Sequence, residues 1–163
     1  MPAYVQPTPL HLLDPVALAN RLRHEVTSAL RGELGRYNDE NASSHRAGQW
    51  SAKQVIGHLI DSAVNNLQRI VRLNTQPEIG LPGYAQNEWV NAQGYSERSW
   101  SELVTLWTAI NLHLAHAMQR VEKAHLEHVW NADGDKITLG FLMEDYIAHL
   151  RHHLDRLPRP TAQ

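Results

Sequence analysis

Two histidines near the end of the chain have the spacing of a metal-binding pair. His149 and His153 are four residues apart, so on an α-helix their side chains share one face, about 40° apart around the axis. Two imidazoles one turn apart can bind a single divalent ion, as they do on the HExxH helix of zinc proteases. His152 points away from that face, toward solvent or a partner surface. A helix with several interfacial histidines is the alternative explanation.

A second group of polar residues lies within segment 51–74, where apolar residues recur at helical spacing. His58 begins a polar row that continues at steps of four, three and four residues with Ser62, Asn65 and Arg69. Solvated helix faces usually carry Lys and Glu, so this row indicates the wall of a site. The planar guanidinium of Arg69 would suit a carboxylate on a ligand.

The elements that must position these groups are helices. Ser51 with Gln54 and Ser99 with Glu102 form two capping boxes, and Thr138 is an expected N-cap. Periodic apolar residues predict four helices, with approximate C-terminal ends, at 15–34, 51–74, 99–122 and 138–157. The sequence therefore predicts an all-α four-helix bundle with a long crossover between the second and third helices.

The rest of the chain is expected to be irregular. We expect one domain over 1–163, with an extended leader at 1–13, a loop at 35–49 and a turn at 131–136. There are no internal repeats and no convincing strand pairs. A short helical turn is expected at 86–91 within the crossover.

Composition excludes several classes of function. The chain has 163 residues and nearly balanced charge, with 15 Lys and Arg against 17 Asp and Glu, so nothing indicates a nucleic-acid partner. It has no cysteine, which excludes disulfides, thiolate metal sites and a catalytic thiol of its own. Without a signal peptide or an apolar run that could span a membrane, a cytoplasmic protein is expected.

The long crossover, residues 76–98, contains a second candidate region. Connections of this length with little regular structure are often functional. Tyr84, Asn87 and Trp89 are expected to lie over one end of the bundle and to contact a substrate or cofactor. The alternative is that the two rings only cap the core.

Ligands for one ion in a bundle come from facing helices, so His58 can join His149 and His153. Three protein ligands leave coordination positions open, which is typical of a catalytic site. Sequence spacing cannot show that the two helices face each other at this height. The other histidines outside this group are expected to be packing or surface residues, among them His113, His116, His125 and His128.

The chain resembles a known family over essentially its whole length. Segment 50–62, the ending 149–153, and Tyr84 with Trp89 are similar to motifs of the DinB-like superfamily, most closely its YfiT branch of metal-dependent hydrolases. The resemblance implies a bundle that binds a divalent ion (Zn, Ni, Fe or Mn) through the same three histidines. It also implies a small-molecule substrate, because some members resemble S-transferases that use a low-molecular-weight thiol. Family endings often carry Gly, Ala or Gln where this chain has 154–156, Leu-Asp-Arg, so the rim of the site is expected to differ.

Three functions are compatible with the sequence. A thiol-dependent S-transferase is favoured, because a metal could hold the thiolate that this chain lacks. The second function is a hydrolase that uses metal-activated water, and such an enzyme needs a general base. Asp61 is the carboxylate nearest to His58 in sequence, but it is expected to point further from the core than His58 does. Asp61 and Asn65 are the catalytic candidates, with Glu88 and Glu144 as weaker bases. A non-catalytic metal-binding or stress-response module is the third. A homodimer is a further expectation.

Overall fold

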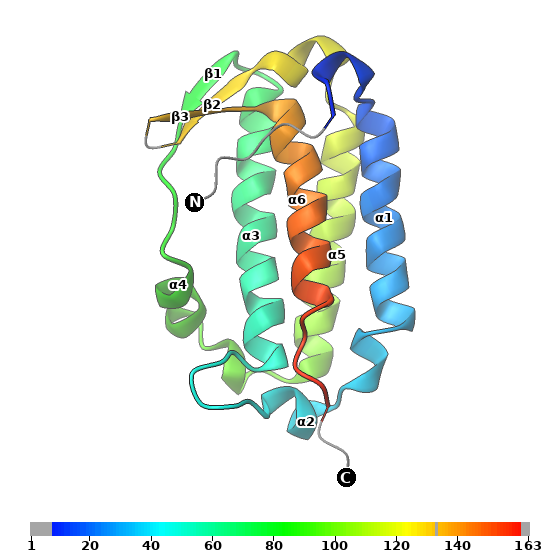
Figure 1. Cartoon of the computed structure of the whole chain (residues 1–163), viewed down its shortest axis with the longest axis vertical. Helices are drawn as coiled ribbons and strands as arrows, with labels where there is room; N and C mark the ends of the chain where they lie inside the picture. The colour runs from blue at the N-terminus through cyan, green and yellow to red at the C-terminus, as the bar shows by residue number, and fades with distance from the viewer. Residues whose placement is uncertain (1–7, 133, 161–163) are drawn as a thin grey trace.

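Four long helices form a bundle in the computed structural model, which describes residues 8–132 and 134–160 (Figure 1). They are α1 (Pro15–Arg31), α3 (Ala52–Leu73), α5 (Trp100–Gln119) and α6 (Leu139–Leu154). The predicted fold class, a four-helix bundle with a long crossover between the second and third long helices, is confirmed.

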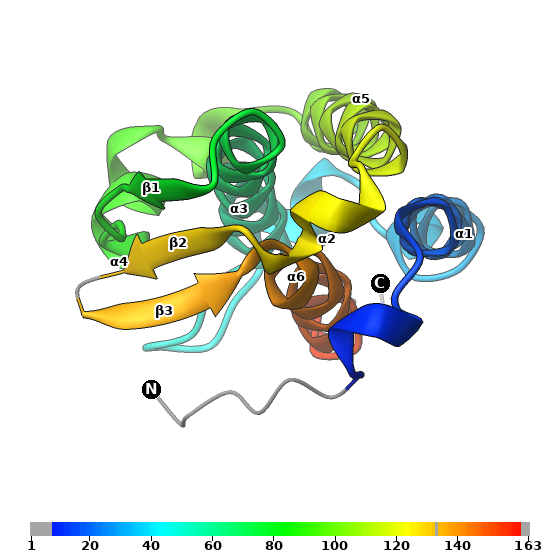
Figure 2. The same ribbon diagram turned by 90° about the horizontal axis from the view of Figure 1, so that it is seen from above.

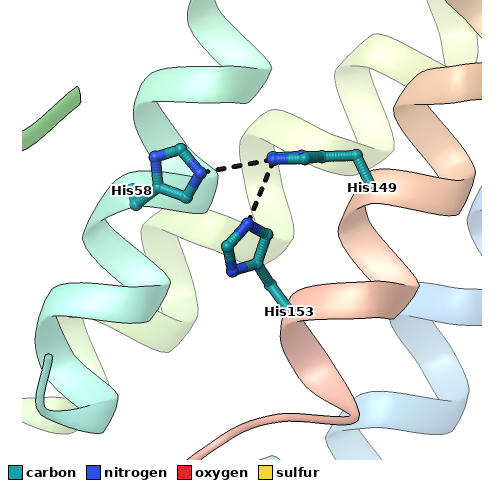
Figure 3. A group of neighbouring side chains, drawn as sticks. All are labelled: His58, His149 and His153. Carbon is teal, nitrogen blue, oxygen red and sulfur yellow. Dashed lines mark hydrogen bonds between the residues drawn. The ribbon is translucent and has the colours of Figure 1, made fainter. Parts of the chain in front are cut away.

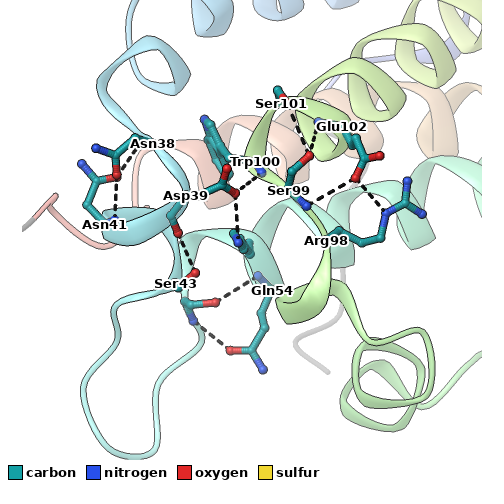
Figure 4. A network of polar contacts seen from close by, with 12 residues as sticks. Asn38, Asp39, Asn41, Ser43, Gln54, Arg98, Ser99, Trp100, Ser101 and Glu102 are labelled. Carbon is teal, nitrogen blue, oxygen red and sulfur yellow. Dashed lines mark hydrogen bonds and ion pairs between the residues drawn. The ribbon is translucent and has the colours of Figure 1, made fainter.

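Side-chain caps explain where these helices begin. The capping boxes expected from the sequence are present: Ser51 with Gln54 starts α3, and Ser99 with Glu102 starts α5 (Figure 4). Thr138 accepts a hydrogen bond from the backbone N–H of Phe141, 3.2 Å away, at the start of α6. Each cap satisfies an N–H group that has no partner inside its helix, which fixes the first turn.

The first helix ends earlier than predicted. The backbone leaves the α-helix after Arg31 and makes a 3₁₀ turn at Leu34–Arg36. The following stretch, expected to be a loop, contains the short helix α2 (Asp39–Ser43), which is capped by Asn38. The leader is described only from residue 8, where Leu10–Leu12 form another 3₁₀ turn.

The short helix α2 joins two long helices at one end of the bundle. The carboxylate of Asp39 accepts a hydrogen bond from the backbone N–H of Trp100 at 2.6 Å, in the first turn of α5 (Figure 4). The same carboxylate pairs with the buried ammonium of Lys53 on α3 at 3.1 Å. One side chain therefore ties the starts of α3 and α5 together.

A small sheet at the other end of the bundle shows that the prediction of no strand pairs was wrong. β1 (Glu78–Gly80) pairs in parallel with β2 (Val129–Ala132), which pairs antiparallel with β3 (Asp135–Thr138). The expected turn at 131–136 is thus the end of a hairpin, in which Gly134 adopts a φ of 102°. Figure 2 shows this sheet beside the ends of α3 and α6. It joins the crossover to the segment that leads into α6.

The crossover continues from β1 along the outside of α3 (Figure 1). Residues 81–85 form no regular element, α4 (Gln86–Ala92) confirms the predicted helical turn, and Tyr95–Glu97 form a 3₁₀ turn. No described helix is both long and apolar enough to cross a bilayer. The core contains large, almost fully buried side chains from the four long helices, including Leu22, Ile56, Trp107 and Tyr146.

Candidate metal centre

Three imidazoles converge between α3 and α6, as Figure 3 shows. Nε2 of His149 lies 3.4 Å from Nε2 of His58 and 3.1 Å from Nε2 of His153. One ligand atom from each ring can be chosen so that all lie within 4.8 Å of one another. The two helices therefore face each other at the height of these histidines, which the sequence alone could not show.

Two of the three separations among these nitrogens match the ligand shell of one ion. Two nitrogens bound tetrahedrally at about 2.0–2.1 Å from zinc are about 3.3 Å apart, close to the separations of 3.4 Å and 3.1 Å seen here. Hydrogen bonding cannot account for both contacts, because Nε2 of His149 has either one proton or one lone pair to offer. A shared divalent ion would satisfy all three nitrogens at once.

The surroundings of the rings favour the uncharged form that binds metals. Burial, followed by the neighbouring His153 and His149, lowers the pKa of His58 to about 3. Burial, followed by His153 and His152, lowers the pKa of His149 to about 4. The pKa of His153 is also lowered, chiefly by burial. Neutral imidazoles present a lone pair at neutral pH without first losing a proton.

His58 is held by packing on its far side. Its ring is fully buried, and the ring of Trp50 lies 5.2 Å away between centroids. Its Nδ1 is sealed from solvent and has no hydrogen-bond partner among the described residues. Metal-bound histidines usually donate this second N–H to an oxygen, and no described residue offers this ring such an acceptor.

Asp61, one turn after His58, is buried because residues of the crossover cover the outer side of α3. Its carboxylate accepts a hydrogen bond from the hydroxyl of Tyr95 at 2.7 Å and another from the amide of Gln93. Gly57 allows this contact, because a Cβ there would lie 2.1 Å from the ring of Tyr95. Burial raises the pKa of Asp61, and its second oxygen has no partner among the described residues.

The polar row beyond His58 is only partly a single wall. Ser62 and Arg69 are buried, whereas Asn65 is half-buried and donates to the backbone carbonyl of Asp61. Asn66 links the two buried members: it donates to the carbonyl of Ser62 at 2.9 Å and accepts from Arg69 at 3.4 Å. Sequence reasoning missed Asn66, although its place four residues after Ser62 gave the same signal.

In the crossover, Tyr84 lies deeper than Asn87 and Trp89. Burial raises the pKa of Tyr84 to about 12, with smaller effects from Asp61, Arg69 and Ser62. Its ring contacts that of Trp89 at 4.9 Å between centroids. Trp89 is 38% exposed and Asn87 is exposed, whereas Tyr84 is half-buried.

Asp145 is a candidate that sequence reasoning missed. It lies one turn before His149 on α6, about 40° around the axis, so the two side chains share a face. It is half-buried, has no hydrogen-bond or ion-pair partner among the described residues, and burial raises its pKa. The weaker candidates lie elsewhere: Glu88 is exposed, and buried Glu144 accepts a hydrogen bond from Thr8 at 2.6 Å.

The remaining histidines lie outside the cluster. His152 is exposed and contacts Arg156, and the exposed rings of His113 and His116 stack 6.3 Å apart. At the sheet end, His125 contacts Asn74 at 3.0 Å and His128 donates to the carbonyl of Leu73. Among the described residues, His58, His149 and His153 are therefore the group of side chains placed to bind one metal ion.

Fold and site together define a four-helix bundle with a three-histidine centre suited to a divalent ion. The family model of the DinB superfamily matches residues 16–156, and the chain belongs to this superfamily. This agrees with the family inferred from the sequence motifs.

Two curated relatives carry the provisional name of metal-dependent hydrolase. The one from Oceanobacillus iheyensis is 25% identical over 118 residues, covering 72% of this chain and 68% of its own. The one from Geobacillus thermodenitrificans is 24% identical over 132 residues, covering 79% and 74%.

A solved structure has the same fold. YfiT from Bacillus subtilis, described provisionally as a metal-dependent hydrolase with an unusual four-helix bundle topology, superposes with a TM-score of 0.71. The match covers 86% of this chain and 79% of YfiT at 17% identity, which establishes likeness of fold alone.

Proposed function

We propose that this protein is a metal-dependent hydrolase of a small-molecule substrate. The observation that carries the proposal is the convergence of His58, His149 and His153, with nitrogens spaced for one ion. Three imidazoles leave coordination positions for water and substrate. A divalent ion held there supplies Lewis acidity and lowers the pKa of water toward 7. The names of the two curated relatives support hydrolysis.

In this proposal Asp145 accepts the proton from the attacking water. Its raised pKa lies nearer the working pH than that of an ordinary carboxyl, and no hydrogen bond to a described residue occupies it. Asp61 is less suited, because Tyr95 and Gln93 already bond one of its oxygens and hold it toward the crossover. Asp61 instead keeps the crossover in place beside His58. Asn65 bonds its own helix and takes no step here.

The thiol-dependent transfer favoured by the sequence has less support, since the relatives' names indicate hydrolysis. It remains a prediction that one experiment separates from the proposal. Purified protein is stripped with a chelator, reloaded with zinc, nickel, manganese or iron, and assayed with chromogenic esters and amides. A parallel assay supplies several small thiols with an electrophile. Metal-dependent product in the thiol assay alone would overturn hydrolysis.

Variants identify the residues responsible. His58→Ala should strongly reduce both bound metal and hydrolysis, whereas His152→Ala, which changes an exposed neighbour of the cluster, should leave both unchanged. Asp145→Asn should keep the metal and lower kcat by about 10²–10⁴-fold, the usual contribution of a general base. Full metal occupancy in His58→Ala, or hydrolysis that resists the chelator, would contradict the proposed centre.

A further inference from the structure

The same face of α3 carries a buried positive charge for which the described residues offer no counter-ion. Arg69 is 6% exposed, and no carboxylate among the described residues lies within ion-pair distance of it. Burial lowers the pKa of Arg69, but a guanidinium in a protein remains protonated. Buried charges in proteins are normally paired, so an unpaired one requires another explanation.

The contacts of Arg69 hold its guanidinium in one place without neutralising it. The group lies over the ring of Trp130 on β2, 3.7 Å from the ring centroid. Trp130 is itself fixed, because its Nε1 donates to the carbonyl of Leu81 at 2.8 Å. Asn66 accepts from one terminal nitrogen of Arg69 at 3.4 Å. The other N–H groups of the guanidinium have no acceptor among the described residues, so they form a preoriented and unused fork of donors.

This fork lies on the side of α3 that faces the metal centre. Arg69 is eleven residues after His58, about 20° around the axis and about 16 Å along it. Helical side chains lean toward the N-terminus, which brings the guanidinium back toward His58. Ser62 lies between them on the same helix, and Asp61, Arg69 and Ser62 all affect the pKa of Tyr84 from the crossover.

We propose that Arg69 forms an anion subsite that binds a carboxylate or phosphate group of the substrate. Both groups present paired oxygens to a guanidinium fork, and Arg69 offers such a fork in a site from which water is largely excluded. The substrate is then a small molecule with an anionic end held at Arg69 and a reactive bond at the three histidines. This assignment of substrate class rests on the proposed hydrolase function, but the subsite can be tested without it.

The test uses metal-free, full-length protein, so that no anion can bind to an ion at the histidines. Succinate and inorganic phosphate are titrated by calorimetry, with neutral succinamide as the uncharged probe. The wild type should bind at least one anion saturably and should not bind succinamide; the stronger anion identifies the group. Arg69→Gln should weaken that binding at least tenfold. Arg72→Gln removes the same charge from an exposed position on the same helix and should leave binding unchanged.

A second measurement needs no variant. In the wild type, the Nε–Hε resonance of Arg69, assigned through its contact with the ring of Trp130, should shift during the anion titration with the same dissociation constant. Equal binding by wild type and Arg69→Gln, or an unshifted resonance at saturation, would overturn the subsite. Arg69-dependent anion binding in a protein that never hydrolyses an ester would instead overturn the proposed function and leave the subsite standing.

Discussion

The sealed imidazole of His58 should make the metal-free protein sensitive to mild acid. In the folded state burial lowers the pKa of His58 to about 3, whereas in the unfolded chain it returns to its ordinary value of 6.5. As pH falls below 6.5, the unfolded state takes up a proton that the folded state does not. The unfolded state is therefore favoured, and stability is lost between about pH 6.5 and about pH 3.

The size of the effect follows from the width of this window. A pH of 5 is about 1.5 units below the pKa of His58 in the unfolded state and still above its pKa in the folded state. Each pH unit in this window changes the free energy of unfolding by about 1.36 kcal/mol. His58 alone should therefore lower the free energy of unfolding by about 2 kcal/mol between pH 7 and pH 5. Comparing the wild type with a variant that lacks this imidazole separates its contribution from that of the other titrating groups.

The assay is urea unfolding followed by circular dichroism at pH 7 and pH 5, with a chelator present throughout. Between pH 7 and pH 5, the free energy of unfolding of His58→Gln should fall by about 2 kcal/mol less than that of the wild type. This difference does not depend on the absolute stability of the variant. His113→Gln, which removes an exposed histidine from α5, is the matched control and should behave as the wild type does. An identical pH dependence in wild type and His58→Gln would mean that His58 is solvated or charged in the folded protein, and the argument from burial would fail.

Three further predictions concern the metal, one close contact and the crossover. Zinc at about one hundred times its dissociation constant should add about 2.7 kcal/mol to the unfolding free energy of the wild type and much less to that of His153→Ala, measured by thermal melting with and without the ion. Gly57→Ala should cost about 1–3 kcal/mol in urea unfolding because its Cβ would meet Tyr95, whereas Gly80→Ala meets no atom within 4 Å and should cost less; equal losses would refute the steric argument. Trp89→Ala should lower the turnover of metal-loaded protein more than its melting temperature, and a large loss of stability with unchanged turnover per folded molecule would instead support a core-capping role.

The parts of the fold that follow from local sequence were predictable. Ser51 with Gln54 and Ser99 with Glu102 mark helix starts because the capping contacts join residues only three apart. The face shared by His149 and His153 follows from helical periodicity alone. In each case both partners lie within one turn, so no knowledge of the rest of the molecule is needed.

The parts that depend on distant segments were not predictable. The three-residue strand β1 pairs with residues of β2 that lie about fifty positions later, as Glu78 does with Val129, and no local pattern marks so short a strand. Asp61 lies on the outward side of α3, but Tyr95 from the crossover covers it. Asp145 has a visible spacing, four residues before His149, but only the packed structure shows that its half-buried carboxyl has no partner among the described residues.

The sealed Nδ1 of His58 also bears on how firmly an ion is retained. When Nε2 of a neutral imidazole coordinates a metal, the ring proton must lie on Nδ1. In His58 that proton would point into a closed space with no acceptor among the described residues. An unsatisfied buried donor costs about 1–3 kcal/mol, which weakens ion binding by roughly 5- to 150-fold relative to a ring with an acceptor. The ion should therefore exchange during purification, and the metal that the isolated protein contains will reflect supply rather than selection.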